Sequence, residues 1–201
     1  MIHVEISNIT KIIGYDLFPK RKVSIKVFNY NFVDGKCYCL GYKDFSGYLI
    51  SLIIAGKIKN RNINISSEKK MPIVNLKEQA ILMGIEENTD KKNNLLYALK
   101  KYKGNNINYE KIFEKYGISE QRQCRKMKNM SSERWRVSFA LGEILEKKIY
   151  CFPWIPSEII DMYSNLWFSD FLNEIKRKGG IIIIPTEITE INMFLFDEVL
   201  E

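Results

Sequence analysis

The chain has 201 residues, 46% of them hydrophobic, and a formal net charge of +7. This length and composition support one globular domain with a sizeable core rather than a disordered chain. The single histidine and the four cysteines, none of them in a CxxC pair, argue against a zinc site, and we expect no bound metal. No apolar run approaches the roughly 20 residues that cross a bilayer, and the first residues do not resemble a signal peptide. We therefore expect a reduced, cytoplasmic setting.

The N-terminal part of the chain is strand-like. Apolar and polar residues alternate over 3–13 and 22–33, which predicts two half-exposed strands. Residues 37–40 are wholly apolar, as expected for a parallel strand that is buried on both faces. Apolar residues at helical spacing then predict a helix over about 48–55, and Gly56 can end it.

The middle of the chain is helical and more charged, and strands return after it. Four helices are predicted at 75–85, 94–102, 109–118 and 131–148. They are followed by a buried strand at 149–152, a long amphipathic helix at 157–178, a buried strand at 181–184 and a last strand at 193–199. Strands that alternate with helices indicate an α/β fold with a mainly parallel sheet core and N-terminal antiparallel strands. We assign this core to 1–70 and 146–201, and a helical subdomain to 71–145.

The stretch "GYKDFSGYL", residues 41–49, joins the short buried strand to the following helix. A glycine, a short turn and then a helix is the layout of a phosphate-binding loop. With the order of the other elements, this layout resembles the nucleotide-binding domain of ABC transporters over nearly the whole chain. The resemblance implies a P-loop NTPase-like fold in which residues 1–201 form a single cassette with a helical, signature-type subdomain.

The loop itself departs from the family's pattern, Gly-x-x-Gly-x-Gly-Lys-Ser/Thr. Aligned on the Ala-Gly pair that ends the helix, Gly41 takes the place of the first glycine and Ser46 that of the last. Gly47 then stands at the lysine and Tyr48 at the first hydroxyl residue. In the family, that lysine meets the β- and γ-phosphates and that hydroxyl holds Mg²⁺. The resemblance therefore implies a vestigial phosphate loop.

Three further motifs are altered as well. Where the family carries its signature, Leu-Ser-Gly-Gly-Gln/Glu, Ser131 and Ser132 replace the two glycines and Glu133 still fits. Where two carboxylates should follow the strand at 149–152, the chain has Pro153 and Trp154. The switch histidine is replaced by Glu187, which adds negative charge where a γ-phosphate would lie.

The resemblance also implies a contact with a membrane subunit. Glu68 is a stand-in for the glutamine of the loop that touches this subunit in the family. We expect a groove for the permease close to it, with Glu68, Met71, Pro72 and Leu76 as contact residues.

Taken together, these losses imply a cassette that no longer hydrolyses ATP. We expect no catalytic residues, and ATP with Mg²⁺ binding only weakly. The expected partners are a second, active ABC ATPase subunit and an ABC permease, with the chain on the inner face of the cell membrane.

Two other functions stay open. In a divergent but working ATPase, Lys43, two residues after Gly41, would take over the phosphates. A basic module that binds nucleic acid or an acidic partner would explain the excess of lysine. However, aromatic residues interleaved with cations on one face, as single-strand binding requires, are not evident, and nucleic acid is not an expected partner.

Overall fold

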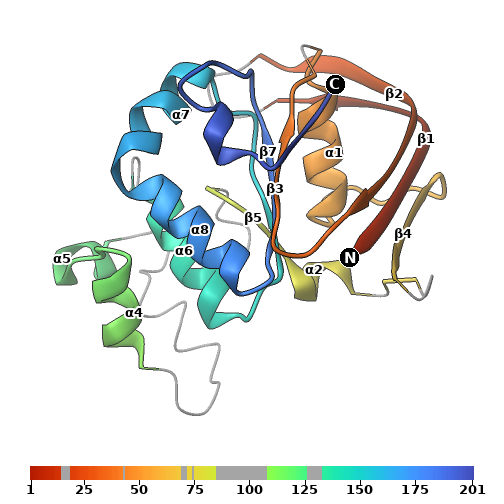
Figure 1. The fold of residues 1–201 in the computed structure, drawn as a ribbon. Coiled ribbons are helices and arrows are strands. Elements are labelled where there is room, and N and C mark those ends of the chain that lie inside the picture. Colours follow the sequence, from red (N-terminus) through yellow and green to blue (C-terminus); the bar gives the residue numbers. More distant parts are fainter. Residues whose placement is uncertain (15–18, 43, 69–71, 74, 85–107, 126–132) are drawn as a thin grey trace. The chain divides into compact units, whose positions relative to one another are not determined.

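The structure is a computed structural model and describes residues 1–14, 19–42, 44–68, 72–73, 75–84, 108–125 and 133–201 (Figure 1). The chain forms two compact units, 1–82 with 148–201 and 83–147. Both sheets lie in the first unit. None of the described helices is long and apolar enough to cross a bilayer.

The N-terminal sheet is antiparallel and three-stranded. Its strands β1 (Ile2–Ile13), β2 (Arg21–Phe32) and β4 (Ile63–Ser67) lie in the order β2-β1-β4. The two predicted half-exposed strands are therefore confirmed, and alternation explains them: every second side chain is buried until Asn8, whose φ of 49° shifts the pattern. β4 was not predicted, because its five residues alternate too briefly to stand out.

The second sheet is parallel and five-stranded. Its strands are β3 (Cys37–Leu40), β5 (Ala80–Leu82), β6 (Ile149–Cys151), β7 (Ile181–Pro185) and β8 (Glu198–Leu200), in the order β5-β6-β7-β3-β8. Every pair of neighbours is parallel. The predicted strands at 37–40, 149–152 and 181–184 are confirmed. These strands, β3, β6 and β7, are buried along their whole length. Continuous apolar runs of this kind are expected where helices cover both faces.

Helices cover the parallel sheet. α1 (Ser46–Ile54) contacts β7 and also the antiparallel sheet, while α8 (Ser169–Arg177) contacts β7 from the other side (Figure 1). The long helix predicted at 157–178 is present in three successive segments, α7 (Ser157–Tyr163), the π-helical η2 (Ser164–Phe168) and α8. α1 therefore lies between the two sheets, and the loop that resembles a phosphate-binding loop joins β3 to its N-terminus.

The second unit is described as three helices. They are α4 (Tyr109–Lys115), α5 (Glu120–Gln123) and α6 (Arg134–Ile144). The Asn108 side chain accepts a hydrogen bond from the backbone N–H of Lys111 at 3.0 Å and so caps α4. Within this unit, the Lys115 ammonium lies 2.6 Å from the Glu143 carboxylate. The helix predicted at 94–102 lies outside the described residues.

Two predicted elements are confirmed only in part. The helix predicted at 75–85 is only α2 (Leu76–Gln79), and the chain then enters β5, the edge strand beside β6. Pairing in the sheet outweighs the helical preference of Ala and Leu there. The strand predicted at 193–199 is a 3₁₀ turn, η3 (Met193–Leu195), followed by the short β8. β5 belongs to the first compact unit, and the second unit spans 83–147.

Candidate functional site

The loop between β3 and α1 has a strained backbone. The Gly41 N–H donates to the Leu200 carbonyl at 2.8 Å, which fixes the start of the loop to β8. Phe45, immediately before α1, has φ 65° and ψ 7°, the left-handed conformation. This conformation costs a residue other than glycine about 1–2 kcal/mol. Interactions of the Phe45 side chain must therefore offset the strain.

A carboxylate of the chain occupies the first N–H group of α1. The Ser46 N–H donates to Asp44 Oδ1 at 3.0 Å. In a phosphate-binding loop, N–H groups at this place bind phosphate oxygens. Asp44 thus supplies an anion of its own and adds negative charge at the N-terminus of the helix. Burial, with a smaller contribution from Asp44, also raises the pKa of the Tyr42 hydroxyl.

Gly47 packs directly against the end of β3. A Cβ atom at this position would lie 2.7 Å from the Leu40 carbonyl oxygen and 2.9 Å from the Leu40 Cβ. Contacts this short do not occur between real Cβ atoms and backbone. The position that aligns with the family's lysine therefore has no room for any side chain unless the loop moves. The next residue, Tyr48, is only 2% exposed and points into the core.

Two aromatic rings stack between the loop and the end of β6. The ring centroids of Phe45 and Trp154 are 4.9 Å apart with an interplanar angle of 28°. The Arg21 guanidinium, from the start of β2, lies 4.9 Å from the Phe45 centroid. Trp154 is only 7% exposed. The loop, the end of β6 and the antiparallel sheet therefore meet in one stack of side chains, and this stack includes the Trp154 that the sequence resemblance predicts beside the family's carboxylates.

The segment after β7 is held by hydrogen bonds. The buried Thr186 hydroxyl donates to the Ile155 carbonyl at 2.8 Å. The Glu187 carbonyl accepts from the Asn192 side-chain amide at 3.2 Å, while Glu187 itself is exposed. Cys39, whose thiol donates to the Thr186 carbonyl at 3.5 Å, is protonated because burial raises its pKa to about 12. It offers no thiolate nucleophile.

The predicted signature and groove residues are only partly described. Lys43, Met71, Ser131 and Ser132 lie outside the described residues. Glu133 is in the second unit, where its Oε1 lies 2.6 Å from Arg122 Nε and its buried Oε2 has no hydrogen-bond partner in the described part of the chain. Across the described residues, no three His, Cys, Asp or Glu side chains group as metal ligands would.

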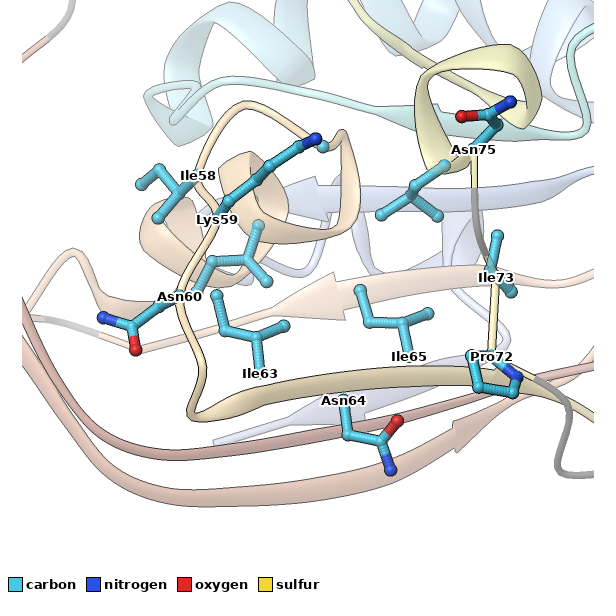
Figure 2. Close-up of a pocket in the computed structure, with 12 residues that line it drawn as sticks. Ile58, Lys59, Asn60, Ile63, Asn64, Ile65, Pro72, Ile73 and Asn75 are labelled. Carbon is cyan, nitrogen blue, oxygen red and sulfur yellow. The ribbon is translucent and has the colours of Figure 1, made fainter.

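A pocket of about 280 Å³ with both apolar and polar lining residues opens between β4, the end of α1 and the segment before α2 (Figure 2). Ile63 and Ile65 extend from β4 into it, whereas Asn64 points to the other side of the strand. Its remaining lining residues include the predicted groove residues Pro72 and Leu76. Glu68 does not line it; this residue is exposed and its carboxylate lies 3.2 Å from the amino group of Met1.

Sequence reasoning missed Arg21 as a site residue. The residue lies in a run of basic side chains, Lys20 to Lys22, which reads as a solvated surface. Its only distinguishing signal is its place opposite Ile13 in the hairpin, which turns it to the inner face of the sheet. That register is not evident before the two strands are aligned.

Comparison with known proteins places the fold. No protein-family model matches the sequence, and no curated protein matches it significantly. The structure is similar to an ATP-binding subunit of an ABC transporter (TM-score 0.68, 17% identity, covering 99% of this chain and 86% of that one). It is also similar to a dimeric bacterial ABC transporter cassette (TM-score 0.68, 13% identity, covering 100% of this chain and 93% of that one). A third similar structure is cbiO1 from Clostridium perfringens, part of the ABC transporter complex cbiONQ (TM-score 0.61, 16% identity, covering 98% of this chain and 82% of that one). The chain therefore has the P-loop NTPase fold of the ABC transporter ATP-binding cassettes.

Proposed function

We propose that the chain is a non-catalytic cassette subunit that works beside an active ATPase subunit. The observation that carries this proposal is the closure of the phosphate loop by the chain's own groups. Asp44 occupies the first N–H group of α1, Gly47 has no space for a side chain, and Trp154 stacks on Phe45. Asp44 thus takes an N–H group that a phosphate would need, the packing at Gly47 leaves no space for a lysine, and Trp154 stands where the resemblance predicts a carboxylate.

The expected effect on nucleotide affinity is large. A charge-assisted hydrogen bond contributes about 1.5–3 kcal/mol. Losing two of them, from the lysine and from the metal-binding hydroxyl, weakens binding by about two to four decades at roughly 1.4 kcal/mol per decade. The carboxylate of Asp44 opposes a triphosphate further by repulsion.

Titration with Mg·ATP tests the proposal. Calorimetry on the purified chain should show no saturable binding below millimolar concentration, and phosphate release should equal that of buffer. Gly47→Lys should not restore either signal, because the lysine cannot enter without displacing the loop from Leu40. Saturable binding with turnover in the wild type would contradict the proposal and favour a divergent ATPase that uses Lys43.

We further propose that the partners are a permease and an active cassette, on the cytoplasmic face of the membrane. Support comes from cbiO1, which is part of a transporter complex, and from the pocket lined by Pro72 and Leu76. The isoleucines that line this pocket suit apolar side chains of another protein, and its lysine and asparagines offer polar groups for orientation. Several large apolar side chains of α7 and the residues around η3 are also exposed, which is typical of protein contacts: Met162 (57%), Ile191 (51%), Met193 (57%) and Phe194 (61%).

Co-purification from the native host tests the partners. The tagged wild type should recover a membrane permease and a second cassette with an intact phosphate loop. Ile58→Glu, which places a charge in the pocket, should reduce permease recovery, whereas Val27→Glu, at a 77% exposed position of β2, should not. A wild-type chain recovered only as a monomer would contradict the proposed assembly.

A further inference from the structure

The Arg21–Phe45–Trp154 stack joins three parts of the first unit that are distant in sequence. Arg21 begins β2 of the antiparallel sheet, Phe45 precedes α1, and Trp154 follows β6 of the parallel sheet. Both ring-to-ring and guanidinium-to-ring distances are 4.9 Å. These distances are within the range for aromatic stacking and for cation–π attraction.

The strain at Phe45 indicates that the stack is the reason for its conformation. A glycine would adopt φ 65° without cost, and the loop contains glycine at other positions. A bulky residue in the left-handed region persists only where its surroundings over-determine it. Here the surroundings of the side chain include Trp154, which stacks on the ring, and the guanidinium of Arg21.

We propose that these three residues form an internal clamp that holds the antiparallel sheet to the parallel sheet without any nucleotide. The inference rests on the proposed function, because a chain that binds no nucleotide has no ligand to order this loop. The contacts among Arg21, Phe45 and Trp154 order the loop instead of a ligand. The first unit consequently keeps one arrangement of its sheets whether or not ATP is present, and a partner meets the same surface in both cases.

Double-mutant cycles on urea unfolding test the contacts. Arg21→Ala and Phe45→Leu should be coupled by a factor of about two to five in the unfolding equilibrium constant, the range of a partly exposed cation–π contact. Trp154→Leu and Phe45→Leu should be coupled by a factor of about two to ten. The matched control is Lys22→Ala with Phe45→Leu, where we expect a factor of one, because Lys22 lies opposite the exposed Ile12 and so faces away from the inner face of the sheet on which Arg21 lies.

Hydrogen exchange with and without 5 mM Mg·ATP (about a physiological concentration) tests the consequence. Arg21→Ala should speed exchange in peptides spanning the start of β2 and the loop about two- to fivefold, while Lys22→Ala should not. Mg·ATP should leave both peptides of the wild type unchanged. If the double-mutant cycles show no coupling and Mg·ATP does not change hydrogen exchange, the clamp is overturned while the proposed function stands. Protection of the loop by Mg·ATP in the wild type overturns the proposed function and, with it, nucleotide independence.

Discussion

Replacing Gly47 with alanine should destabilise the protein, although alanine normally stabilises a helix. Gly47 is the second residue of α1, and Gly→Ala within a helix is worth about 0.5–1 kcal/mol in favour of alanine. Against this gain, the new Cβ would lie 2.7 Å from the Leu40 carbonyl oxygen, a backbone atom that cannot rotate away. Overpacking of a core costs about 1–3 kcal/mol. The net result should be a loss of about 1–2 kcal/mol.

Equilibrium urea unfolding, followed by circular dichroism, measures this loss. The midpoint should fall while the slope of the transition stays constant, because the surface exposed on unfolding is unchanged. In a thermal melt, the same loss should lower Tm by about 2–8 °C in a chain of this size. Because alanine adds no charge and no polar group, the measured change reports the packing of the loop against β3.

Two other glycines serve as controls. At Gly41 a Cβ would have its nearest neighbours at 3.4 Å or more, so Gly41→Ala should change stability by less than about 0.5 kcal/mol. At Gly179 nothing lies within 4 Å but φ is +77°, so Gly179→Ala should show the backbone cost alone, about 1 kcal/mol. If Gly47→Ala were as stable as the wild type or more stable, the loop would have room for a side chain, and the argument for a closed site would fail.

Three further predictions concern other parts of the structure. In the native protein at pH 8, iodoacetamide should label only the exposed Cys124, because the other cysteines are buried and burial raises the pKa of Cys39 to about 12; mass spectrometry showing a second label would contradict this. A hydrogen bond from Lys36, and to a smaller extent one from Tyr30, lowers the pKa of the Glu198 carboxyl from 4.5. The ionised carboxylate therefore stabilises the fold above pH 4.5, and this stabilisation is lost as the pH falls through the folded-state pKa. Glu198→Gln should therefore lower the urea midpoint at pH 7, and its difference from the wild type should shrink as the pH falls below 4.5; a difference that does not shrink in acid would refute the assignment. Thr186→Val, which removes a buried hydroxyl that donates to a backbone carbonyl, should cost about 1–2 kcal/mol in urea unfolding, whereas no loss would mean that the carbonyl finds another donor.

Much of the fold follows from local pattern. The alternation in β1 and β2 and the apolar runs of β3 and β7 identify their strands because side-chain periodicity reports burial directly. β5 could not be found in this way. Its three residues, Ala80–Leu82, continue the apolar spacing of a helix, and only the neighbouring strand β6 makes them a strand.

The candidate site was predictable in position but not in detail. Gly41 and the following helix mark a loop of phosphate-binding layout, and the alignment leaves Gly47 at the lysine. Leu40 leaves no space for a side chain at Gly47, and Phe45 adopts the left-handed conformation in which its ring stacks on Trp154. Both features depend on how separate segments of the chain pack together. Periodicity carries no information on such contacts, so they required the structure.

The order of strands in the parallel sheet has a consequence for biogenesis. In the parallel sheet β3 lies between β7 and β8, which follow it in the chain only after the second compact unit, 83–147. The hairpin of β1 and β2 can form as soon as it emerges from the ribosome, whereas the apolar residues of β3 have no strand partner until β7 has been synthesised. Pairings this remote in sequence form slowly and leave apolar segments exposed to aggregation in the meantime. Nascent chains that stall before β7 should therefore depend on chaperones.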